Sequence, residues 1–180
     1  MTLLLFDQLY WLHGLGPKER IWLEAAALLH DIGVNQDNEQ HHKATRDVII
    51  REWPAAPFTI REKMIIGLIA RYHRGALPKD AHMYYQDLDK HDKKVVGKLA
   101  ALLRLADGLD RSHQDIVQRI LCHREKRRVI LTLKARRISR AEDALGKEKA
   151  DLFEKVFGKR IKLEWQTEER ERKTAEEIIR

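Results

Sequence analysis

The spacing of apolar residues changes once along the 180-residue chain, and this change limits the fold to a helical part followed by a smaller mixed part. Up to about residue 109, apolar residues recur every three or four positions, as they do on the buried face of a helix. From residue 117 onward the apolar stretches are short and rich in β-branched residues, which is typical of strands. We therefore expect an α+β fold that is mainly α.

Glycine, proline and polar stretches divide the helical part into five predicted helices. They cover residues 1–12, 17–32, 42–53, the segment that Thr59 begins, and 89–109. Thr59 is a good N-cap, and Pro17 suits the first turn of the second helix. The first predicted unit is thus a five-helix bundle over residues 1–113.

A small strand-strand-helix-strand unit over residues 114–166 is predicted to follow the bundle. Strands at 117–122 and 129–133 are joined by a turn near residues 125–126, and a helix at 141–157 leads to a strand at 160–165. The last stretch, residues 167–180, is nearly all charged and is expected to form a solvated helix or a frayed tail.

Composition excludes several classes of protein. A hydrophobic content of 43% excludes disorder over most of the chain, and a single cysteine, Cys122, excludes both a disulfide framework and a four-cysteine zinc site. No apolar run approaches the roughly 18 residues that cross a bilayer, so no membrane association is expected. The first residues do not resemble a signal peptide, which makes the cytoplasm the expected location.

The segment from Arg119 to Arg140 carries nine Lys and Arg residues against one acid, while the whole chain has a net charge of +7. One interpretation is a solvated edge strand that resists aggregation. The other is a track for a polyanion. Because no aromatic residue occurs between positions 86 and 152, base stacking has little support, so polyphosphate fits better than nucleic acid.

His30 and Asp31 end an Ala- and Leu-rich helix, and Asp107 lies four residues after Leu103 on the apolar face of another. An isolated His-Asp pair is usually a hydrogen-bonded surface feature. Two helices that each turn a ligand-type residue inward, however, form metal sites in bundles. Imidazole and carboxylate ligands suit Mn, Fe, Co or Zn, and Mg where carboxylates dominate.

Leu28–Gly33, which reads LLHDIG, resembles the signature of the HD superfamily of metal-dependent phosphohydrolases. A closer resemblance covers nearly the whole chain. It is to the C-terminal region of the exopolyphosphatase / guanosine pentaphosphate phosphohydrolase family. The motifs that carry it are AALLHDIG (Ala26–Gly33), HH (His41–His42), ARYHRGALPK (Ala70–Lys79) and LLRLADGLDRSH (Leu102–His113).

The resemblance implies that His30, Asp31 and Asp107 are metal ligands and catalytic residues. It makes His42 and His73 candidates to bind a second divalent metal or to hold the attacking water molecule, with His41 as the alternative to His42. It also implies phosphate binding by five basic residues in these motifs: Arg71, Arg74, Lys79, Arg104 and Arg111. A solvated basic rim is the other interpretation of these five.

The sequence also departs from the family pattern. The superfamily's first ligand, a histidine upstream of Leu5–Leu9, has no counterpart in the first twelve residues, and His13 is a poor replacement. A neighbouring family histidine is Ala44 here. Family members also carry an actin-like half that performs polyphosphate cleavage, and we expect it to be absent from this chain.

Two functions are consistent with these features. The first is a metal-dependent phosphohydrolase domain that acts on polyphosphate, guanosine polyphosphate or a phosphorylated small molecule. The second is a non-catalytic module that binds polyphosphate or nucleic acid and has a degenerate metal site. A separate actin-like phosphatase chain and a second copy of the chain, as a homodimer, are the protein partners to consider.

Overall fold

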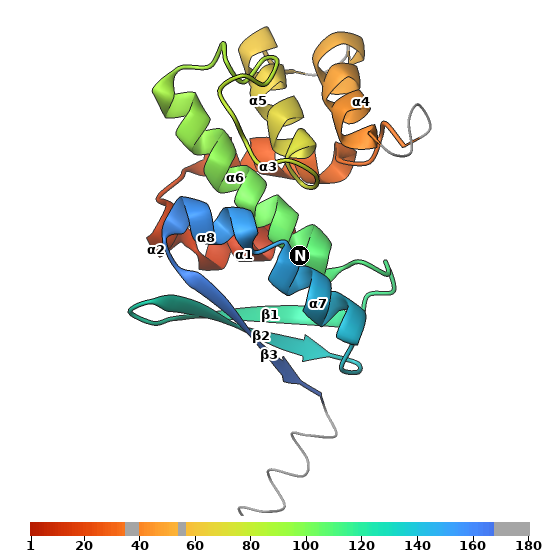
Figure 1. Ribbon diagram of the computed structural model, residues 1–180, viewed down its shortest axis with the longest axis vertical. Coiled ribbons are helices and arrows are strands. Elements are labelled where there is room, and N and C mark those ends of the chain that lie inside the picture. Colours follow the sequence, from red (N-terminus) through yellow and green to blue (C-terminus); the bar gives the residue numbers. More distant parts are fainter. Residues whose placement is uncertain (35–39, 54–56, 168–180) are drawn as a thin grey trace, which may run out of the picture.

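The computed structural model describes residues 1–34, 40–53 and 57–167, and within them the fold is α+β and mainly α (Figure 1). The helices are α1 (Thr2–Gln8), α2 (Tyr10–His13), α3 (Pro17–Leu29), α4 (His41–Asp47), the π-helix η1 (Val48–Glu52), α5 (Ile60–Arg71), α6 (Lys90–Leu109), α7 (Arg140–Glu148) and α8 (Asp151–Phe157). The strands are β1 (Val117–Arg124), β2 (Arg128–Ala135) and β3 (Arg160–Gln166).

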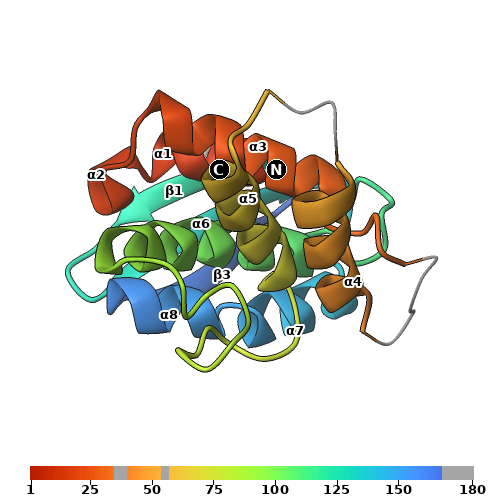
Figure 2. The ribbon, with the colours of Figure 1, turned by 90° about the horizontal axis from the view of Figure 1, so that it is seen from above.

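Helix α6 is the element around which the others pack. It begins at Asp89, whose side chain accepts a hydrogen bond from the backbone N–H of Asp92 at 2.8 Å. It contacts α1, α3 and α5 as well as α7 and α8, so it lies in the middle of the helical layers (Figure 2). Val96, Leu99 and Leu102 on this helix are fully buried, which places the hydrophobic core along its length.

The sheet has the order β1-β2-β3, with β1 and β2 antiparallel and β2 and β3 parallel. Helices α7 and α8 form the crossover between the two parallel strands, as parallel pairing requires. Val129, Leu131 and Leu133 of the central strand are fully buried, and α1 contacts β1 while α7 and α8 contact β3 (Figure 1). The predicted hairpin and third strand are confirmed.

Several predicted helix boundaries were wrong, because apolar spacing does not reveal where a helix turns. The first predicted helix is divided at Leu9, and the single helix expected at 141–157 is two helices separated at Lys149–Ala150. Helix α3 ends at Leu29, so His30 and Asp31 lie in the turn after it. The predictions for Pro54 and for residues 168–180 lie outside the described residues.

The described part of the chain contains no helix that combines the length and the hydropathy needed to cross a membrane.

His13 is buried and serves the fold. One of its ring nitrogens, Nε2, lies 2.8 Å from the carbonyl oxygen of Phe6, and the other accepts a hydrogen bond from the backbone N–H of Leu15 at 2.9 Å. Both ring nitrogens of His13 are therefore engaged by backbone groups of nearby residues.

The surroundings of two glycines in α6 predict opposite effects of a substitution by alanine. At Gly108 an added Cβ would lie 2.9 Å from the carbonyl oxygen of Leu145, so Gly108→Ala should destabilise the protein by about 1–3 kcal/mol. At Gly97 the nearest atom, Cγ2 of Val156, would be at an ordinary 3.6 Å, so Gly97→Ala should be neutral or stabilise by up to about 1 kcal/mol. Urea unfolding of both variants checks this, and equal changes in unfolding free energy would contradict the packing of α7 on α6.

Candidate metal and phosphate site

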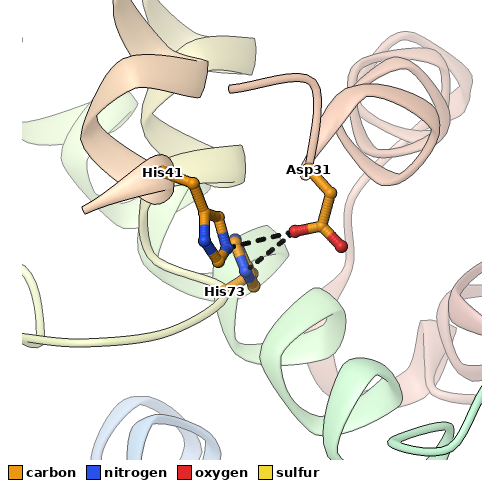
Figure 3. A group of neighbouring side chains, drawn as sticks. All are labelled: Asp31, His41 and His73. Atoms are coloured by element: carbon orange, nitrogen blue, oxygen red, sulfur yellow. Dashed lines mark ion pairs between the residues drawn. The ribbon is translucent and has the colours of Figure 1, made fainter. Parts of the chain in front are cut away.

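Asp31, His41 and His73 bring their ligand atoms within 4.8 Å of one another (Figure 3). One carboxylate oxygen of Asp31, Oδ1, lies 3.2 Å from Nε2 of His41 and 3.5 Å from Nε2 of His73. The side chains of His41 and His73 are 7% and 2% exposed, whereas that of Asp31 is 42% exposed. Two buried imidazoles thus face one accessible carboxylate, an arrangement that a divalent metal ion can share.

The turn after α3 is tied directly to α4, and this tie places His41. The backbone N–H of Gly33 donates to Oγ1 of Thr45 at 3.0 Å, and the Thr45 hydroxyl donates to the carbonyl oxygen of His30, also at 3.0 Å. A Cβ at Gly33 would lie 2.7 Å from the carbonyl oxygen of His41, so only glycine allows this close approach. His41 and Asp31 therefore come together from segments ten residues apart.

The ring of His73 is oriented for Nε2 to act as a ligand. Its Nδ1–H donates to the carbonyl oxygen of Ala70 at 2.6 Å, which leaves the lone pair on Nε2, facing Asp31. Burial lowers the pKa of His73 to about 3, so the imidazole is neutral at physiological pH. A neutral imidazole whose other nitrogen is held by a carbonyl is the usual state of a metal-binding histidine.

His30 connects this cluster to Asp107 on α6. Its Nδ1 lies 2.7 Å from the carbonyl oxygen of Ala27, and its Nε2 is 3.3 Å from Oδ2 of Asp31 and 3.8 Å from Oδ1 of Asp107. The hydrogen bond from His30 holds the pKa of Asp31 well below its usual range. Burial lowers the pKa of His30, but the contacts with Asp31 and the Ala27 carbonyl outweigh it and leave that pKa raised.

His42 lies outside the cluster that contains His41. Its Nδ1 is buried, and no hydrogen-bond partner for it occurs among the described residues, while a Cβ at Gly75 would lie 3.0 Å from its Nε2. Burial, together with the nearby charges of Arg71 and Arg74, lowers the pKa of His42 to about 4. Of the two adjacent histidines that the sequence left open, the structure thus brings His41 to Asp31.

A cavity of about 290 Å³ opens beside the cluster. Its lining residues are Asp31, His41, His73, Arg74, Gly75, Arg104, Asp107, Arg111, His113, Leu145, Glu148 and Lys149. Three of the five basic residues predicted to bind phosphate are therefore here, while Arg71 and Lys79 are not among the lining residues. Lys79 is exposed on the loop after α5.

The three arginines of the cavity differ in how free they are. Arg104 is buried and makes two hydrogen bonds to the carboxylate of Asp151, at 2.7 and 2.9 Å, and one to the carbonyl oxygen of Gly75 at 3.1 Å. It therefore supports the fold of the cavity wall. Arg111 is exposed, and NH1 of Arg74 lies 3.3 and 3.4 Å from the two ring nitrogens of His41. These two guanidinium groups are the ones available to a ligand.

In a comparison with family models, residues 1–155 match the model described as "Ppx/GppA phosphatase, domain III". The chain belongs to the Ppx/GppA family. The match spans every residue of the cavity and ends within α8, so β3 lies beyond it. No curated protein matches the chain.

Lys149 lines the cavity of this Ppx/GppA domain, and the sequence did not single it out. Its ammonium group pairs with Oδ2 of Asp107, and burial is the main reason that its pKa falls to about 8. In the sequence it lies among the charged residues of a helix predicted to be continuous. The break between α7 and α8 is what turns it into the cavity, and apolar spacing carries no signal for that break.

The adjacent histidines provide a matched test of the metal site. His41→Ala should weaken divalent-metal binding by at least about 10–100-fold, because it removes a direct ligand. His42→Ala should leave metal binding close to that of the unsubstituted protein. Metal content by elemental analysis after supplementation with Mn, Co or Zn, followed by desalting, checks this. A loss of metal in His42→Ala with retention in His41→Ala would reverse the assignment.

Proposed function

We propose that this domain is an HD-type, metal-dependent phosphohydrolase that acts on phosphate-rich substrates such as polyphosphate or guanosine polyphosphate. The observation that supports this most directly is the Asp31 carboxylate, which faces the Nε2 atoms of two buried imidazoles in a cavity that also holds cationic side chains. Membership of the Ppx/GppA phosphatase family supports the substrate class.

Asp31, His41 and His73 would hold the metal, and His30 and Asp107 complete the ligand set from the other side of Asp31. This mixture of nitrogen and oxygen donors suits Mn, Fe, Co or Zn better than Mg, which prefers oxygen ligands. The bound metal would supply Lewis-acid polarisation of a phosphoryl oxygen and lower the pKa of a water molecule.

Arg74, Arg111 and Lys149 would neutralise the phosphate oxygens. Guanidinium groups match phosphate because two parallel N–H bonds fit two oxygens. Arg104 cannot add to this set without breaking its pair with Asp151, so its proposed role is to hold the wall in place. The cavity thus combines carboxylates that would hold a metal cation with positively charged side chains that would hold a phosphate anion.

The basic hairpin gives weaker support to the alternative of a pure polyanion-binding module. Arg128 pairs with Glu125 at the turn, and Arg136 pairs with Asp115 at 3.2 Å. Part of the positive charge of the hairpin is therefore neutralised by carboxylates close to it. The matching family model describes the third domain of a Ppx/GppA phosphatase. This supports the further proposal that the domain works with other Ppx/GppA domains.

We expect metal-dependent release of inorganic phosphate from tripolyphosphate or a guanosine polyphosphate, and Asp31→Asn should reduce it at least about 100-fold. Asp80→Asn is the matched control, because Asp80 pairs with Lys93 on the surface, away from the cavity. Phosphate release is measured with Mn, Co, Zn and Mg in turn and with a chelator. Substrate binding without release under all these conditions would favour the non-catalytic module instead.

A further inference from the structure

Another cavity, of about 370 Å³, is lined by residues of α6, of α8 and of the loop after α5. Helices α6 and α8 lie side by side here (Figure 2). No described residue lines both this cavity and the one at Asp31. Its volume falls in the range of roughly 300–1,000 Å³ that is usual for small-molecule sites. The molecule therefore has room for a small ligand away from the candidate metal cluster.

The interior of this cavity is apolar. Leu152 and Val156 of α8 line it together with Pro78 and Tyr85 of the loop, and Leu152 is 2% exposed. Gly97 of α6 supplies no side chain to fill the space. Beyond its own helical neighbours, a Cβ at Gly97 would meet only Cγ2 of Val156, at an ordinary 3.6 Å. A flat apolar group can therefore approach the backbone of α6 closely.

The charged lining of the cavity is entirely positive. The described residues that line it include four lysines and no acidic residue: Lys93, Lys94 and Lys98 come from α6, and Lys155 comes from α8. Lys94 and Lys98 are four residues apart on one helix, where like charges repel each other. Because α8 brings a further ammonium group to the same cavity, the arrangement favours an anionic ligand.

Lys93 is the one lysine of this set that pairs with a carboxylate among the described residues. Its Nζ donates to Oδ1 of Asp80 at 2.9 Å and lies 5.4 Å from the centroid of the Tyr85 ring. The side chain of Asp80 is 86% exposed, so this pair lies in water and contributes little stability. A single solvated carboxylate thus faces four ammonium groups.

Lys94 and Lys155 are the ammonium groups available to a ligand. Both residues are exposed, and in the described part of the chain neither has an ion-pair partner or a hydrogen-bond acceptor. Lys98 differs, because its Nζ donates to the carbonyl oxygen of His13 at 2.7 Å. The cavity therefore combines an apolar interior with two free cations.

We propose that this cavity binds a small organic anion that carries a flat apolar ring. The ring packs against Gly97, Tyr85 and Leu152, and the anionic group pairs with Lys94 and Lys155. Tyrosine favours aromatic neighbours, and an ammonium group pairs with a carboxylate or a phosphate as a point charge. The ring belongs to an aromatic acid or to a nucleotide. Binding needs no metal, and it goes beyond the phosphohydrolase proposed above.

Calorimetric titration of the full chain in EDTA tests the site without the metal. The probes are 2-naphthoate and guanosine monophosphate. Acetate lacks the ring, whereas 2-naphthylmethanol and guanosine lack the charge. We expect at least one probe to bind, at least about tenfold more tightly than any of these three compounds, because both apolar burial and the lysine charges contribute. Binding of 2-naphthoate identifies an aromatic acid as the ligand, and binding of guanosine monophosphate identifies a nucleotide.

The two free lysines provide the first variant. Lys94→Met combined with Lys155→Met should weaken probe binding at least about tenfold, because both unpaired cations are lost. Lys126→Met combined with Arg127→Met is the matched control. It removes the same charge from exposed positions of the hairpin turn and should bind as the unsubstituted protein does.

Gly97 provides the second variant. Gly97→Leu fills the cavity from α6 and should abolish probe binding, while the unfolding midpoint should not fall, because leucine is a better helix former than glycine. Gly97→Ala adds only a methyl group and should keep the binding. Should Gly97→Leu fail to fold, the lysine variant still decides, since both of its positions are exposed.

Three results would overturn the proposal. They are unchanged affinity in the lysine variant, equal binding of the uncharged ring compounds, and binding of neither probe to the unsubstituted protein. His41→Ala separates this site from the phosphohydrolase, because it should lose metal and keep probe binding. Loss of probe binding in His41→Ala would place the ligand in the cavity at Asp31 and would also overturn the proposal.

Discussion

The contact between the turn after α3 and the start of α4 is the constraint on which the candidate site depends. Thr45 bridges the backbone of Gly33 and His30 through its hydroxyl, and Gly33 leaves no room for a side chain. These contacts hold the backbone of Asp31 against the first turn of α4, where His41 begins the helix. Backbone packing therefore brings Asp31 and His41, two of the candidate ligands, to the same place.

Other helices also contribute residues to this junction, and these residues come from the ends of the helices rather than from their middles. His73 follows α5, Asp107 lies in the last turn of α6, and Lys149 lies at the break between α7 and α8. Residues at helix ends have backbone groups that the helix does not satisfy, and here the Ala27 and Ala70 carbonyls orient two histidine rings. A bundle whose helix ends converge can thus position ligands precisely while its middle remains apolar.

Much of the fold could be predicted from the sequence, because the change in apolar spacing, the cap at Thr59 and the β-branched strands are local signals. The breaks at Leu9 and Lys149 could not, because they depend on packing against other elements. His30, Asp31 and Asp107 were identified from motifs and helical periodicity, and the structure places them close together.

The pair His41–His42 marks the limit of sequence reasoning at the site. Consecutive residues of a helix point about 100° apart, so only one of them can face Asp31, and the direction depends on how α4 is rotated against α3. The same holds for Arg71 and Arg74 in one motif. They were predicted to act together, but Arg74 lines the cavity whereas Arg71 is not among its lining residues.

The distribution of charge in the cavity relates its possible metal ligands to its cationic side chains. In the cavity, Lys149 pairs with Asp107 and Arg104 with Asp151, so most buried charges there have a partner of opposite sign. A metal ion would compete with Lys149 for Asp107 and would leave a lysine available to a phosphate oxygen. If the proposed function holds, metal and phosphate would therefore favour each other in this cavity.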